Sequence, residues 1–174
     1  MFAAADQRAR VYQDKYLLIG KKKMNEVVLQ ETANYQFSIS DLLAAYMWNH
    51  MKDKDCTQVS KKDNHIQYQI VTELPPIVQA AFGKSISMLE DAEITSEGFV
   101  SHTTGIMPGC SFTANMTFYG DNVASNLKME VNLKWNDGIS EFIKQPTKSF
   151  IVSKVRDWSK SLYKSFEEYK QNEK

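Results

Sequence analysis

The clearest pattern in the chain is the strict alternation of apolar and polar side chains from Leu127 to Trp135. A period of two is typical of a β-strand that buries one face and exposes the other. Weaker forms of the pattern, bounded by Gly, Pro and Asn turn signals, predict five further strands. These lie at Met24–Phe37, Ile66–Glu73, Ile86–Thr95, Phe99–Thr104 and Ser111–Tyr119.

Two segments carry apolar residues at the spacing of an α-helix. After the N-cap candidates Ser38 and Ser40, the apolar residues in Leu42–His50 predict a short helix. In Ile151–Tyr169 apolar residues recur at intervals of three and four, which predicts a long C-terminal helix. Pro146 is expected in the first turn of this helix, because its missing N–H would have no intrahelical partner there.

The order of these elements predicts the fold. Strand, short helix, five more strands and a long helix resembles an α+β START-like helix-grip fold, in which a curved antiparallel sheet wraps around the C-terminal helix. Residues 24–174 are predicted to form this one domain, because a chain of 174 residues leaves little room for two. Residues 1–23 are predicted to be an N-terminal arm or linker. The polar stretch Met51–Asn64 is predicted to be a loop.

A sheet curled around a helix closes imperfectly, and the gap is predicted to form an apolar ligand cavity. Methionines alternate with aromatic residues on the inward faces, and Met suits adaptable apolar surfaces. The alternative is that these side chains pack against each other and leave no cavity. The predicted lining is Phe112, Met116, Phe118, Met129, Val131, Leu133, Trp135, Trp158 and Phe166.

The histidines and cysteines form no recognisable motif. His50, His65 and His102 lie in separate segments without a Cys or acid at metal-ligand spacing. His50 is interpreted as a helix-end residue that meets the negative end of the helix dipole. Cys110 has no evident base beside it and is interpreted as a small buried strand residue. The sequence therefore predicts no metal site and no cofactor.

Three carboxylates, Glu90, Asp91 and Glu93, lie close together near the end of one predicted strand. A carboxylate pair could act as acid and base, but solvated charge at a sheet edge is the interpretation that we favour. No phosphate-binding loop or nucleophile elbow is present in the sequence. We therefore expect no catalytic residues and a protein that is not an enzyme.

The formal net charge of zero conceals an uneven distribution. Residues 1–23 hold six Lys or Arg and two Asp, and residues 144–174 hold eight basic and four acidic residues. Basic ends favour contact with an anionic membrane, with Lys144 and Lys148 as membrane-facing candidates. The alternative is that these lysines only solvate helix surfaces. No dense basic face suggests nucleic-acid binding. Two cysteines without a disulfide framework suggest the reducing cytoplasm. We expect a monomer that is peripheral at membranes.

Several short motifs resemble the VASt domain, the START-like sterol-transfer module of Aster- and Lam-type proteins. The resemblance covers roughly Asn25–Tyr169 and includes Ser38–Leu43, Thr103–Phe112, Leu127–Trp135 and Phe142–Pro146. It implies binding of a sterol and its transfer between membranes without chemistry on the lipid. Such proteins usually also carry a lipid-binding GRAM domain and a membrane-spanning helix, and neither is in this sequence. The chain is therefore interpreted as an excised domain or as a free carrier.

The stretch Leu74–Gly83 instead resembles PRELI-type lipid carriers, in which a short helix acts as a lid. That resemblance implies a phospholipid ligand and lid residues Ile77, Val78, Ala81 and Phe82. Candidate gates are Pro75–Lys84 and Met51–Asn64. Three other classes stay open: an enzyme of cyclase or hydrolase type on the same fold, a scaffold or chaperone-binding module without ligand, and an allergen-like binder of small apolar molecules.

Overall fold

The computed structural model describes residues 25–173, which form one seven-stranded antiparallel sheet and three helices. The predicted arm, residues 1–23, lies outside the described residues. The strands are β1 (Asn25–Tyr35), β2 (Cys56–Lys62), β3 (His65–Glu73), β4 (Ser85–Ile94), β5 (Gly98–Met107), β6 (Cys110–Gly120) and β7 (Ser125–Trp135). The helices are α2 (Ile39–Lys52), α3 (Pro76–Phe82) and α4 (Glu141–Asn172).

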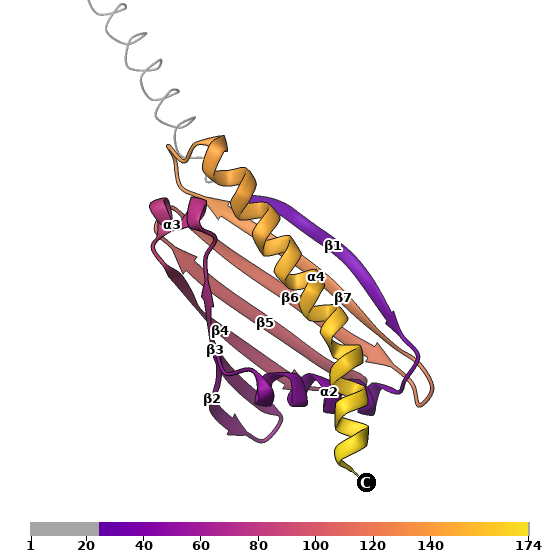
Figure 1. The fold of residues 1–174 in the computed structure, drawn as a ribbon. Coiled ribbons are helices and arrows are strands. Elements are labelled where there is room, and N and C mark those ends of the chain that lie inside the picture. The colour runs from indigo at the N-terminus through magenta and orange to yellow at the C-terminus, as the bar shows by residue number, and fades with distance from the viewer. Residues whose placement is uncertain (1–24, 174) are drawn as a thin grey trace, which may run out of the picture.

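The strand order is β1-β7-β6-β5-β4-β3-β2, so β2 to β7 form a meander and β1 pairs with the last strand. Helix α4 runs obliquely across one face of the sheet, with α2 at one end and α3 at the other (Figure 1). The predicted fold class, a curved antiparallel sheet wrapped around a long C-terminal helix, is confirmed. The alternating apolar residues of β7 face α4 and the core, as the pattern predicts.

The structure corrects the prediction that Met51–Asn64 is a loop, because Cys56–Lys62 is a seventh strand. This strand pairs antiparallel with β3, from Cys56 opposite Ile70 to Lys62 opposite His65. Six of its seven residues are exposed, so no hydrophobic pattern marks it. The strand is defined only by its backbone hydrogen bonds to β3. It lies at the edge of the sheet, where exposed lysines are typical because they discourage pairing with another chain.

The structure also corrects the position of Pro146, which lies inside α4 and not in its first turn. The helix begins at Glu141, where the carbonyl of Ser140 accepts the N–H groups of Ile143 and Lys144, each at 3.0 Å. Pro146 has no N–H for the carbonyl of Phe142, so the helix lacks one internal hydrogen bond.

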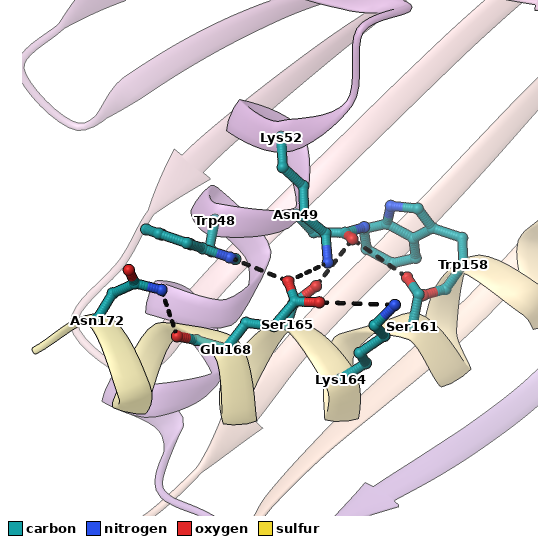
Figure 2. Close-up of polar contacts among 9 residues, drawn as sticks. All are labelled: Trp48, Asn49, Lys52, Trp158, Ser161, Lys164, Ser165, Glu168 and Asn172. Atoms are coloured by element: carbon teal, nitrogen blue, oxygen red, sulfur yellow. Dashed lines mark hydrogen bonds and ion pairs between the residues drawn. The ribbon is translucent and has the colours of Figure 1, made fainter.

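Polar contacts join α2 to the C-terminal half of α4. Asn49 Oδ1 accepts hydrogen bonds from Ser161 Oγ at 3.3 Å and Ser165 Oγ at 2.9 Å (Figure 2). Glu168 pairs with Lys52 Nζ at 2.6 Å and accepts the Trp48 indole N–H at 3.3 Å. These contacts hold the two helices against each other at this crossing.

Candidate ligand cavity

A cavity of about 460 Å³ lies between the sheet and α4, within the size range of about 300–1,000 Å³ usual for small-molecule sites. The sheet contributes inward-facing apolar side chains from β3, β4 and β6: Ile70, Ile86, Met88, Phe112, Ala114 and Met116. Helix α4 contributes Phe150, Ile151, Val155 and Trp158. The wall is therefore mainly apolar, and this space is not filled by the side chains around it.

Of the nine predicted lining residues, Phe112, Met116 and Trp158 line the cavity. The other six, which the structure places in the packed interior outside it, are Phe118, Met129, Val131, Leu133, Trp135 and Phe166. Two of these stack on other rings: Phe118 on Phe99, with ring centres 3.8 Å apart, and Phe166 on Phe37, at 4.2 Å.

The physical reason is the path of α4. The inward side chains of β7, among them Met129, Val131 and Leu133, are at most 2% exposed because the packed core covers them. Between α4 and strands β3 to β6 that cover is incomplete, and the cavity opens there. Alternation identifies the inward face of each strand but not the part of that face on which a helix rests.

The predicted lid forms a helix, α3, in which Val78 and Phe82 are buried and Ile77 and Ala81 are exposed. None of these four residues lines the cavity, whereas Leu74, just before the helix, does. The movement of α3 as a lid stays a prediction.

A buried polar cluster, which the sequence analysis above does not predict, lies at the cavity wall. Glu90 is 4% exposed and accepts hydrogen bonds from the hydroxyls of Tyr46 and Ser101, both at 2.6 Å. His50 Nε2 lies 2.9 Å from Glu90 Oε2, and both residues line the cavity.

The interpretation of Glu90 as solvated edge charge is therefore wrong, and His50 is more than a helix-end residue. The alternation of β4 contains the signal that could have revealed this. Ile86, Met88, Glu90 and Ala92 share one face of the strand, so Glu90 occupies a position that an apolar residue would normally take. Asp91 and Glu93 are on the opposite face, where Glu93 is exposed, Asp91 is half-buried and both lie near His65.

The pKa values indicate that His50 and Glu90 form an ion pair. Burial by itself lowers the pKa of His50, but the hydrogen bond and charge of Glu90 outweigh it and raise the pKa above 6.5. Burial likewise acts to raise the pKa of Glu90, and the contacts with His50, Ser101 and Tyr46 lower it below 4.5. His50 Nδ1 donates to the Tyr46 carbonyl at 2.9 Å, so both ring nitrogens of the imidazolium have acceptors.

This arrangement leaves one acceptor position free. From residues 25–173, Glu90 Oε1 accepts two hydrogen bonds, whereas Oε2 accepts only the one from His50. A carboxylate oxygen has room for two. Thr103 is buried, lines the cavity and makes no side-chain hydrogen bond to another of the described residues. A ligand with a hydroxyl or N–H group can therefore find partners at this wall.

The cysteines do not supply a nucleophile. Burial raises the pKa of Cys110 to about 12, and burial with the charges of Asp53 and Glu90 raises the pKa of Cys56 to about 12. Both thiols stay protonated at neutral pH. Within residues 25–173 no group of three or more His, Cys, Asp or Glu side chains is arranged to hold a metal ion.

The two predicted membrane-facing lysines are both engaged in ion pairs. Lys148 Nζ lies 2.6 Å from Glu26 Oε1 and joins α4 to β1. Lys144 Nζ lies 3.2 Å from Glu141 Oε1 and 5.9 Å from the centre of the Trp135 ring. Neither residue lines the cavity. Among the described helices, none combines the length and apolar character needed to cross a bilayer.

No protein-family model matches the chain, and no curated protein matches it in sequence. Solved structures do match. The Zhui aromatase/cyclase from Streptomyces sp. R1128 is 6% identical with a TM-score of 0.54, and the match covers 87% of this chain and 97% of that one. A START superfamily protein from Mycobacterium smegmatis is 10% identical with a TM-score of 0.51, covering 80% and 97%. Norcoclaurine synthase from Thalictrum flavum, in complex with dopamine and hydroxybenzaldehyde, is 12% identical with a TM-score of 0.50, covering 84% and 92%.

The architecture and these matches define a START-like helix-grip domain. The prediction that the chain is not an enzyme is contradicted, because an aromatase/cyclase and a synthase share this fold. At such low identity the matches establish the fold and no activity. The more specific resemblances to the VASt domain and to PRELI-type carriers stay predictions.

Proposed function

We propose that this protein binds a largely apolar small molecule of lipid size in the cavity beneath α4. The observation that carries the proposal is the unfilled space of about 460 Å³, walled by apolar side chains and interrupted by the His50–Glu90 pair. Removing some 300 Å² of apolar ligand surface from water would contribute about 7 kcal/mol before ordering costs, at about 25 cal/mol per Å². That is sufficient to retain a poorly soluble molecule.

The polar groups of the wall support a ligand that donates a hydrogen bond. Glu90 Oε2 and the Thr103 hydroxyl are the acceptors that the ligand would meet. A sterol hydroxyl and an amine N–H both have this property. A phospholipid is less compatible, because Asp53, Asp55 and Glu73 also line the cavity and would repel its phosphate.

The test compares two cavity-filling substitutions. Ala114 is buried and lines the cavity, so Ala114→Leu places new methyl groups in empty space. Ala45 is fully buried on α2 and does not line the cavity, so Ala45→Leu overpacks the core. Binding of Nile red and of a fluorescent sterol is measured by titration, and stability by thermal unfolding.

We expect Ala114→Leu to weaken dye binding about tenfold or more while the melting temperature is maintained, because new contacts replace empty space. Ala45→Leu should lower the melting temperature instead. Equal dye binding by the wild type and Ala114→Leu would contradict the proposal. So would the absence of any co-purified lipid together with no uptake of either probe.

Transfer of the bound lipid between membranes is the second candidate, and exposed apolar residues at one end of the molecule favour it. Ile106 is 80% exposed on the β5–β6 hairpin and Phe142 is 71% exposed in the first turn of α4. The two elements are neighbours, because the Asn136 N–H before α4 donates to the Gly109 carbonyl of the hairpin. Flotation with phosphatidylcholine vesicles should be lost in Ile106→Asp and Phe142→Asp and retained in Val123→Asp, an exposed residue of the β6–β7 turn.

A further inference from the structure

The open side of the cavity is bordered by carboxylates. Asp53 and Asp55, which follow α2, and Glu73, at the end of β3, all line the cavity and are exposed to solvent. The Val71 N–H donates to the Asp55 carbonyl at 2.9 Å and holds this segment beside the end of β3. No ion pair joins any of the three carboxylates to another residue of the described part of the chain.

The positive charge at the cavity is smaller. Across the opening, α4 contributes one cation, Lys154, whose Nζ lies 5.6 Å from the centre of the Phe150 ring. The charge of His50 is matched by Glu90, so among the described residues that line the cavity three carboxylates at the mouth face a single ammonium group. The potential at the mouth is therefore negative, and it attracts cations and repels anions.

A second observation places a ligand group at the same cavity. Thr103, 7% exposed, has its side chain in the cavity wall with no hydrogen-bond partner among the described residues. Together with the free acceptor position of Glu90, it offers unused hydrogen-bonding capacity inside the same space that the carboxylates border. Both groups border the cavity, so a molecule bound there can supply hydrogen-bond partners to them.

We propose that the ligand is a cationic amphiphile, with an apolar body beneath α4 and a protonated amine beside Asp53, Asp55 and Glu73. This rests on the proposed function, since it names the class of molecule that the cavity takes. The amine gains attraction from three carboxylates without a competing ion pair, whereas a carboxylate or phosphate at the same place meets repulsion.

The test uses three probes with one chain and different head groups: dodecylamine, dodecanol and dodecanoate. Each displaces Nile red from the full chain at neutral pH, below its micelle concentration. We expect the amine to bind most tightly and the carboxylate least. An exposed carboxylate contributes about two- to fivefold in affinity. The double variant Asp53→Asn/Asp55→Asn should therefore weaken the binding of dodecylamine about fivefold or more and leave the binding of dodecanol unchanged.

The control is Asp137→Asn, which removes an exposed carboxylate that does not line the cavity and should leave the order and the affinities unchanged. Added salt should weaken dodecylamine binding and not dodecanol binding, because it screens exposed charges. If the three probes bind equally, or dodecanoate binds most tightly, the charge selection is overturned while the cavity proposal stands. If neither Nile red nor any probe binds, the proposed function itself fails.

Discussion

The imidazole of His50 and the carboxylate of Glu90 meet at 2.9 Å in the interior, although one lies near the end of α2 and the other in the middle of β4. Both residues are 4% exposed. A charge pair this deeply buried is costly unless it is fully hydrogen-bonded. Tyr46 and Ser101 both donate hydrogen bonds to Glu90 Oε1, and the Tyr46 carbonyl accepts the second ring N–H of His50.

Replacing Glu90 by Leu should lower the free energy of unfolding by about 3–5 kcal/mol, because His50, Tyr46 and Ser101 would lose their common acceptor. Glu90→Gln should lower the free energy of unfolding by less, since the amide oxygen still accepts hydrogen bonds. Urea denaturation measures both. On the same strand, Glu93 is exposed, and Glu93→Leu should change stability by no more than about 0.5 kcal/mol. Equal effects at the two positions would contradict a structural role for the pair.

The pair should also make stability depend on pH. The folded-state pKa of His50 is raised above 6.5, so its contribution is complete below pH 6.5 and is lost as the pH rises through the folded value. The pKa of Glu90 is lowered below 4.5, so its contribution is complete above pH 4.5 and is lost as the pH falls through the folded value. We expect the greatest contribution between these pH values.

Urea midpoints across the pH range measure this dependence. In Glu90→Gln the fall on the alkaline side should largely disappear, because no carboxylate then holds the proton on His50. His102, an exposed histidine, provides the control, and His102→Gln should retain the fall. A wild-type profile that is flat above pH 6.5 would argue against an imidazolium–carboxylate pair.

Gly105 and Phe112 face each other across β5 and β6, and the ring occupies the space that a side chain at Gly105 would need. A Cβ added there would overlap Cε1 of the ring. Gly105→Ala should therefore drive the Phe112 ring into the cavity, reduce Nile red binding and cost about 1–3 kcal/mol. Thr104→Ala, at the preceding position with its side chain on the opposite face of the sheet, should leave dye binding intact. Unchanged binding in Gly105→Ala would place the ligand elsewhere.

Pro146 inside α4 leaves the helix one hydrogen bond short. Pro146→Ala restores the N–H and should raise the free energy of unfolding by about 1–2 kcal/mol, after subtraction of the unfolded-chain entropy that proline removes. Chemical denaturation measures this, with Gln145→Ala as the neighbouring control at an exposed position. A lower stability in Pro146→Ala would show that the proline ring makes packing contacts of greater value than the hydrogen bond.

Hydrophobic periodicity by itself determined the helix-grip architecture of this chain. The alternation in β7 and the helical spacing in α4 record which face of each element is buried, and burial is the main contribution to folding. The Ser38 N-cap of α2 was equally visible, because capping depends on neighbouring residues.

Only the tertiary structure decided where the cavity lies and which charges it contains. Strand β2 exists because its backbone pairs with β3, and no side-chain pattern records that pairing. Phe112 lines the cavity while Leu133, its partner in the pairing of β6 with β7, is packed in the core. Periodicity reports the face that a residue occupies, whereas a cavity and a buried ion pair depend on what the other elements bring to that face.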